Sequence, residues 1–292
     1  MNEKVASDFL PVFAASKLGP LCGNVSESTK FRFLKEFKPF SDLIPKSSKR
    51  NQNFQLSTNE KSQIKSFMDI NIDSENLRFN DQEIMNNFKI DTIPILNSEI
   101  IEDNLLESDA EEYFTAESDE ESFITANDKK RNEFTAIKSL NALRFISTSR
   151  GNKLEKSILE RTNEEKQMNF IRNKTKKYKD FNLFKIVGII DGISAEHKCI
   201  LEIKTRSKFN KNKDTITKSE KIQALVYMNM HECDKCLFVE CGSNGEIKQT
   251  MIDYDDFKFQ NEVIRSLEEF CYFAQNITQD ELENLIKKYS VI

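Results

Sequence analysis

Two short segments rich in Ile and Val, residues 184–193 and 199–203, constrain the fold of this chain more than any other feature. Such β-branched residues favour strands, and the polar residues 194–197 between the segments let the chain turn back. If the chain reverses at Glu196 and His197, residues that face each other have numbers that add up to 393. We therefore expect an antiparallel hairpin in which Asp191 lies opposite Glu202.

Helices and further strands are expected on both sides of this hairpin. Before it, a helical apolar face spans residues 137–145, Gly151 interrupts the pattern, and a second helix follows at residues 153–168. The buried stripe of this second helix is Leu154, Ile158 and Leu159. After the hairpin we expect a helix, two strands joined by the turn at Asn244 and Gly245, and two helices, at residues 218–230, 236–241, 247–254, 255–276 and 278–289. This order predicts an α/β core with a mixed sheet flanked by helices.

The rest of the chain divides by composition. Residues 1–35 are expected to form an N-terminal helical element, with a short helix that ends near Gly19 or Gly23. Residues 36–130 are polar and acidic with weak periodicity, and we expect a long, partly disordered insertion there. Residues 131–292 hold the core described above.

Charge is strongly segregated along the chain, although the formal net charge is -5. Residues 98–128 carry twelve Asp or Glu and no Lys or Arg. Residues 129–222 carry 24 Lys or Arg against 11 Asp or Glu, a net charge of +13. A basic block of this size suits a polyanion such as DNA, although an ordinary solvated surface has the same composition.

The acidic tract, residues 98–128, admits two interpretations. It contains the related sequences YFTA (residues 113–116) and FITA (residues 123–126), which resemble docking motifs for a partner protein. A disordered, solvating segment has the same composition, and we favour that interpretation.

The facing carboxylates of Asp191 and Glu202 indicate a metal site. At a cross-strand Cβ separation of about 5 Å two carboxylates repel each other, and a divalent cation between them removes that repulsion. Strand alternation puts Lys204 on the same face as Glu202, where its ammonium group would orient a water for attack on phosphorus. A solvated strand face would explain Lys204 but not the paired acids.

Two helices add polar side chains to this constellation. Glu155 lies near the beginning of the helix before the hairpin and could supply a third carboxylate. Gln223 and Tyr227 are four residues apart on the helix after it, and hence on one face. An amide and a phenol suit contacts with phosphate, with a DNA end or with the catalytic residues.

Taken in this order, the motifs resemble those of the PD-(D/E)xK nuclease superfamily. Asp191, ten intervening residues and then the Glu-Ile-Lys of residues 202–204 are similar to its defining motif. Gln223 and Tyr227 match the Q-x-x-x-Y motif of RecB-like members.

Two upstream motifs resemble one branch of that superfamily, the phage and viral recombinase-type alkaline exonucleases related to lambda exonuclease. These motifs are Gly151 with Glu155, and the Ala-Ser-Lys-Leu-Gly of residues 15–19. The chain departs from this branch in the long insertion between the two motifs.

The resemblance implies a restriction-endonuclease-like core that hydrolyses DNA with Mg²⁺, for which Mn²⁺ would substitute. Asp191, Glu202, Glu155 and the backbone carbonyl of Ile203 would be the metal ligands, and Lys204 would be the catalytic lysine. It further implies an exonuclease of viral or phage-like recombination and replication, with a ring-shaped homo-oligomer if digestion is processive.

Side chains around this site and in the N-terminal motif are expected to contact DNA. They are Gln223, Tyr227, Arg150, Arg206, Lys208, Ser16 and Lys17. For each cation among them, a solvated surface position is the alternative.

Two rival functions stay open. One is an endonuclease or a RecB-like nuclease that processes single strands. The other is a catalytically silent DNA-binding or scaffold protein, recruited through its acidic tract. The intact set of Glu155, Asp191, Glu202 and Lys204 favours an enzyme.

The six cysteines indicate a reducing compartment, the cytoplasm or the nucleus, of a host cell if the protein is viral. No apolar run is long enough to span a bilayer, and we expect no membrane association. Cys236 and Cys241 are expected at opposite ends of one strand, a spacing that argues against an iron–sulfur cluster shared with Cys233 and Cys22.

Overall fold

The structure is a computed structural model, and it describes residues 10–23, 25–38, 40–44, 56–79, 126–207, 209 and 215–289. The acidic tract up to residue 125, Lys208 and the predicted helical segment at residues 84–88 lie outside these ranges. No helix within them is both long enough and apolar enough to cross a membrane.

A mixed five-stranded sheet is the centre of the molecule, in the order β10-β9-β8-β7-β4. Its strands are β4 (Ile171–Arg172), β7 (Gly192–Ser194), β8 (Cys199–Arg206), β9 (Lys235–Gly242) and β10 (Ile247–Asp253). β8 and β9 pair in parallel, and the other neighbours are antiparallel. The predicted mixed α/β core is therefore confirmed.

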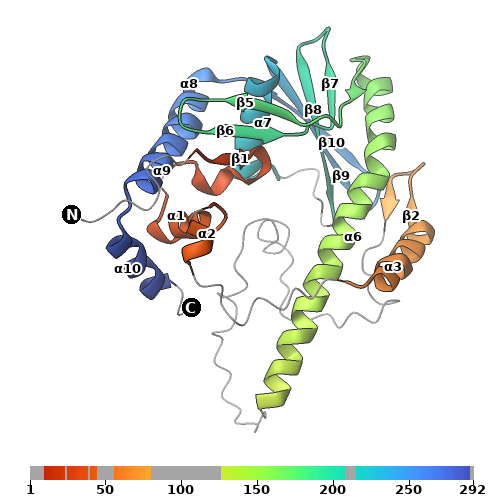
Figure 1. Cartoon of the computed structure of the whole chain (residues 1–292). Helices are drawn as coiled ribbons and strands as arrows, with labels where there is room; N and C mark the ends of the chain where they lie inside the picture. The colour runs from red at the N-terminus through yellow and green to blue at the C-terminus, as the bar shows by residue number, and fades with distance from the viewer. Residues whose placement is uncertain are drawn as a thin grey trace.

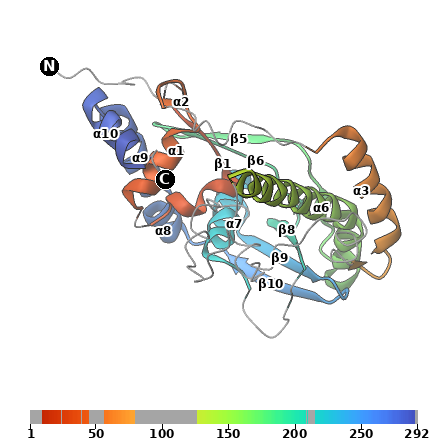
Figure 2. The same ribbon diagram turned by 90° about the horizontal axis from the view of Figure 1, so that it is seen from below.

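The two faces of this sheet are covered by different layers (Figures 1 and 2). Side chains alternate along a strand, so Leu201 packs toward the long helix α6 (Ala126–Lys166), while Ile200 packs toward α7 (Lys218–His231). The predicted stripe of Leu154, Ile158 and Leu159 is buried in the α6 layer, as expected.

Four C-terminal helices complete the α7 layer: α8 (Asp256–Lys258), a π-helix (Phe259–Ile264), α9 (Arg265–Asn276) and α10 (Gln279–Tyr289). The last three pack with α1 (Glu27–Leu34) and α2 (Phe40–Leu43) around one apolar cluster, which includes the edge-to-face pair of Phe13 and Phe270. Figures 1 and 2 show this group on the opposite side of the molecule from α3.

The N-terminal element differs from the predicted short helix. It consists of β1 (Val12–Ala14) and two 3₁₀ turns, Ala15–Lys17 and Gly19–Leu21. β1 pairs in parallel with β6 (Lys185–Gly188), which pairs antiparallel with β5 (Lys177–Asp180), so these strands form a second, three-stranded sheet. Strand pairing with a distant segment overrides the local helical tendency here.

Part of the predicted insertion is folded. α3 (Thr58–Asn71) and the small hairpin of β2 (Ile72–Asp73) and β3 (Arg78–Phe79) bury Ile64 and Met68 against α6. The interpretation of residues 36–130 as a partly disordered insertion therefore stays a prediction, and these elements are a folded part of it whose few apolar residues fall on one face.

Gly151 does not divide the helix that contains it. α6 continues through this position, where a Cβ would meet only Thr205 Oγ1 at 3.8 Å. A glycine inside a helix costs about 1 kcal/mol relative to alanine, which neighbouring packing offsets, and the predicted interruption was therefore wrong.

Candidate active site

The predicted strand at residues 184–193 is two strands, and the carboxylate of interest lies where the chain passes from one sheet to the other. β6 ends at Gly188 and β7 begins at Gly192. At Gly188 the backbone passes against the ring of Tyr227, because a Cβ there would lie 2.3 Å from Tyr227 Cε1. Asp191 thus sits at the mouth of the β7–β8 hairpin rather than inside a strand.

The register of that hairpin agrees with the sequence-based expectation. Gly192 pairs with Leu201, and Ser194 pairs with Cys199. The next pair outward is Asp191 and Glu202, and the backbone N–H of Ile203 donates to Asp191 Oδ2 at 2.7 Å. The two carboxylates therefore come from the two adjacent arms of the hairpin, Asp191 from the residue before β7 and Glu202 from β8, on the α7 face of the sheet.

Both carboxyl groups have pKa values above their ordinary range. The pKa of Asp191 is raised to about 8, mainly by burial and secondly by the negative charge of Glu202. Glu202 is only 4% exposed, and burial raises its pKa as well. Two buried acids that disfavour ionisation side by side form an arrangement that a cation would stabilise.

Lys204 provides one positive charge beside this acid pair. Its Nζ lies 3.0 Å from Glu202 Oε1 and donates to Gln223 Oε1 at 3.4 Å. Burial lowers the pKa of Lys204, but Glu202, Glu220 and Asp191 together outweigh burial and raise it. Lys204 is thus held as an ammonium ion at the acid pair.

Helix α7, which covers this face of the sheet, holds the acid pair in place. Gln223 Nε2 donates to Glu202 Oε1 at 3.0 Å and to the hydroxyl of Tyr227 at 3.3 Å. Burial, and next the charge of Glu202, raise the pKa of Tyr227, so its phenol stays neutral. Gln223 and Tyr227 are both buried, Gln223 against Glu202 and Tyr227 against Gln223, whereas the predicted DNA contacts require exposure.

The beginning of α7 is set by a capping box. Thr217 accepts the backbone N–H of Glu220 at 3.2 Å, and the Glu220 carboxylate accepts the N–H of Thr217 at 3.0 Å. This reciprocal pair satisfies free N–H groups in the first turn. The capping box therefore fixes where α7 begins, shortly before Gln223.

Glu155 approaches the acid pair from α6 but is already paired. Its two carboxylate oxygens accept from Arg172 Nε at 2.7 Å and from Arg172 Nη2 at 2.5 Å. Its negative charge raises the pKa of Asp191 and of Glu202, after the larger effects named above. Glu155 is thus part of the same electrostatic site.

These residues can hold a divalent cation in one particular way. Among the described residues, no group of three or more His, Cys, Asp or Glu side chains is arranged to hold a metal ion. Mg²⁺ needs only one or two protein carboxylates, with water and phosphate as its remaining ligands. Asp191 and Glu202, two neighbouring carboxyl groups at the β7–β8 hairpin, fit that requirement.

Known proteins give similarity at the level of structure. No protein-family model matches the sequence, and no curated protein matches it. The structure is similar to solved exonucleases. An alkaline exonuclease from Laribacter hongkongensis shares 17% identity over 58% of this chain and 89% of its own, with a TM-score of 0.38. The same enzyme in complex with dAMP has a TM-score of 0.37, at 17% identity over 58% of this chain and 88% of that one.

A phage-related exonuclease from Haemophilus somnus is also similar. It shares 16% identity over 49% of this chain and 73% of its own, with a TM-score of 0.35. At such values the similarity says nothing about activity, so the function rests on the geometry of the acid pair.

Two predicted DNA contacts are buried ion pairs or hydrogen-bonded groups, and their prediction was wrong. Arg150 is 1% exposed, donates to Thr205 Oγ1 and to the Thr205 carbonyl, and lies over the ring of Phe79. Arg206 donates to both oxygens of Glu220 at 2.8 Å and to Glu240 at 3.2 Å. The sequence could not show this, because the partners come from distant elements: Phe79 on β3 and Thr205 on β8 for Arg150, and acids on α7 and β9 for Arg206.

The N-terminal motif lies beside α7. Ala15 is buried near Gly188 and Tyr227, whereas Ser16 and Lys17 are exposed. Lys17 Nζ lies 3.4 Å from Glu36. The predicted DNA contacts of Ser16 and Lys17 therefore stay predictions, with both side chains accessible.

Sequence reasoning missed Arg172, the partner of Glu155. It lies on the two-residue strand β4, directly before the basic segment of residues 174–180. A two-residue strand has no periodicity that would predict it. The one usable signal was that Arg172 is the single Arg between the end of the predicted helix, at residue 168, and the hairpin.

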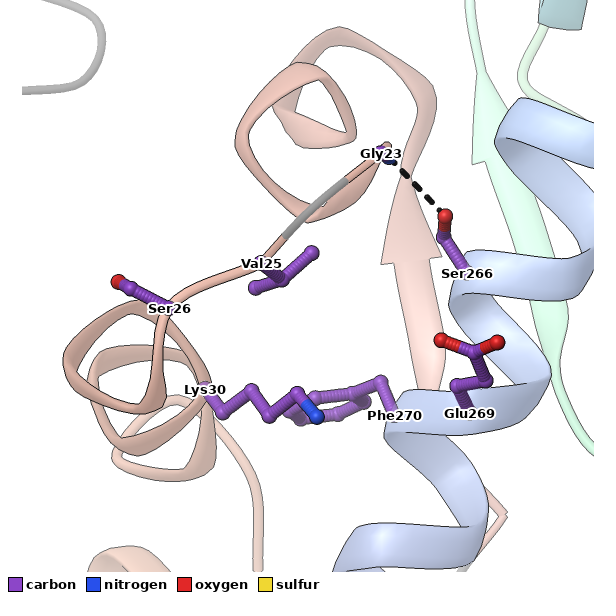
Figure 3. A pocket seen from close by; sticks show the side chains of 7 residues that line it. All are labelled: Gly23, Val25, Ser26, Lys30, Ser266, Glu269 and Phe270. Atoms are coloured by element: carbon purple, nitrogen blue, oxygen red, sulfur yellow. Dashed lines mark hydrogen bonds between the residues drawn. The ribbon is translucent and has the colours of Figure 1, made fainter.

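In the part of the chain that the structure describes, no cysteine forms a hydrogen bond with a residue of this site, and a separate pocket lies elsewhere. All six cysteines are free and buried. A pocket of about 400 Å³ lies where α1 faces α9, and Gly23 N–H donates to Ser266 Oγ there at 3.0 Å (Figure 3). Lys30 and Glu269 bring opposite charges to its wall, so the pocket selects no anion.

Proposed function

We propose that this protein is a metal-dependent DNA nuclease of the PD-(D/E)xK type. One observation carries the proposal: the β7–β8 register brings Asp191 and Glu202 together, with Lys204 bonded to Glu202. Two acids and one ammonium ion in a buried site are poorly suited to structural stability. They are well suited to hydrolysis of a phosphodiester.

Each residue then has a defined role. Asp191, Glu202 and the carbonyl of Ile203 would hold a Mg²⁺ or Mn²⁺ ion, with Glu155 as a further ligand if it leaves Arg172. When bound, the cation lowers the pKa of a water and offsets charge on the phosphate oxygens. Lys204 orients that water and stabilises developing negative charge. Gln223 keeps the Glu202 carboxylate in place.

The basic block supports DNA as the substrate. Residues 129–222 have the net charge of +13 noted above, and the exposed Lys174 and Lys176 follow Arg172 closely in the chain. Polyanion binding depends mainly on such cations.

Within this class we favour an exonuclease of viral or phage-like recombination and replication. The support is the Ala15–Lys17 turn, part of the motif shared with that branch, which packs beside Tyr227 of α7. Incubation with linear and covalently closed circular DNA tests this choice. An exonuclease degrades only the linear form, whereas cleavage of the circle would assign an endonuclease.

The nuclease proposal itself is tested with Lys204→Ala. We expect Mg²⁺-dependent cleavage by the wild type and a loss of about 10²–10⁴-fold in rate in the variant, with DNA binding kept. Lys235→Ala is the matched control. This exposed lysine lies on the neighbouring strand β9, five residues before Glu240, which is the residue that pairs with Lys204. Equal activity of Lys204→Ala and the control would refute the assignment.

A further inference from the structure

Arg172 is placed at the edge of the candidate site. It lies on β4, the edge strand of the five-stranded sheet, and pairs with Gly192, the residue after Asp191. The next residue, Asn173, donates its backbone N–H to the carbonyl of Asp191 at 3.4 Å. Backbone pairing therefore holds the guanidinium group beside the acid pair.

The guanidinium group has one edge in use and another open. Nε and Nη2 bind the two oxygens of Glu155 side-on. A guanidinium carries five N–H donors in a rigid plane, so the edge formed by Nη1 and Nη2 still has donors for a second acceptor. No described residue forms a hydrogen bond with Nη1, and the side chain is 30% exposed.

The chemistry of that open edge selects a phosphate. An arginine fork binds phosphate oxygens in a bidentate manner, which a lysine cannot do. Glu155 anchors the first edge and so pre-orients the second, at little entropic cost on binding. A guanidinium group stays protonated in proteins, so the positive charge of Arg172 is permanent.

We propose that Arg172 binds a DNA phosphate next to the acid pair, with its Glu155-bound edge fixed and its open edge on the substrate. This inference rests on the proposed nuclease function. The alternative is that Arg172 only positions Glu155.

The test measures how DNA binding depends on salt, in the presence of Mg²⁺ and in a Lys204→Ala background that leaves the DNA uncut. The probe is a short fluorescent blunt-ended duplex followed by anisotropy. One phosphate contact contributes about 0.9 to the slope of log K against log salt concentration. We expect Arg172→Gln to lower the slope by about that amount and Arg172→Lys to keep it.

Two controls isolate the contact. Arg265→Gln removes an exposed arginine that pairs with Glu269 on α9, and the slope should not change. The second control compares Glu155→Gln with the double variant Arg172→Gln/Glu155→Gln. These two proteins differ only at residue 172, and neither has a Glu155 carboxylate that has lost its arginine partner. The double variant should have the lower slope, even if Arg172→Gln alone is unstable.

Equal slopes in that matched pair would overturn the inference and leave Arg172 as a positioning residue for Glu155. Failure of the nuclease proposal is seen separately, because the wild type would then not cleave DNA with Mg²⁺ at all. A wild type that cleaves, with equal slopes in the matched pair, refutes the role of Arg172 alone.

Discussion

At the scale of single residues, Asp191 determines how the site responds to pH. Its carboxyl group is buried, faces Glu202 and has a pKa raised to about 8, against an ordinary value of 3.8. Below that pKa the metal-free protein keeps a proton there, and a cation would have to displace it. Metal binding is therefore expected to strengthen as the pH rises.

The same pKa predicts the pH dependence of stability. Between the ordinary value and about 8 the folded state holds a proton that the unfolded state has lost, so stability falls as the pH rises through this window. Thermal unfolding of the metal-free wild type and of Asp191→Asn, from about pH 5 to about pH 9, measures this effect. The wild type should lose stability relative to the variant as the pH rises. A difference that is the same at every pH would contradict the account.

At the scale of secondary-structure elements, the sequence correctly predicted the elements that depend on local residue patterns. The hairpin register, α7 and the β9–β10 hairpin agree with the predictions, and the latter turns at Gly245, whose φ of 82° favours glycine. Residues 184–193 were wrongly joined because a single apolar run does not show a change of sheet. The site residues that share one strand or one helix could be predicted from the sequence. Arg172 could not, because only tertiary packing brings its partner Glu155 close.

The elements around β8 also predict how much Arg206 contributes to the free energy of unfolding. Its charge is buried between Glu220 on α7 and Glu240 on β9. Arg206→Gln would leave two buried acids without their cation, and we expect a loss of about 3–5 kcal/mol in the free energy of unfolding. Urea denaturation measures it, with the exposed pair at Arg265 as control, where Arg265→Gln should cost less than about 1 kcal/mol. Equal costs would argue that Arg206 is not a structural cation.

At the scale of the whole molecule, the acidic tract is separable from the catalytic core in our account. The described core has its own two apolar clusters, and α6 begins at Ala126, after most of the tract. A protein that lacks residues 98–125 should therefore keep its Mg²⁺-dependent cleavage of a short duplex within about a factor of two, as for a surface change away from the site. Loss of cleavage with normal thermal unfolding would show that the tract takes part in the reaction.

The proposed reaction depends on one divalent cation shared by Asp191 and Glu202, and isothermal titration calorimetry with Mn²⁺ tests for this ion most directly. We predict that the wild type binds Mn²⁺ at this site, that Asp191→Asn and Glu202→Gln each abolish the binding, and that Lys235→Ala keeps it. Unchanged Mn²⁺ binding in both acid variants, with each still folded, would contradict it.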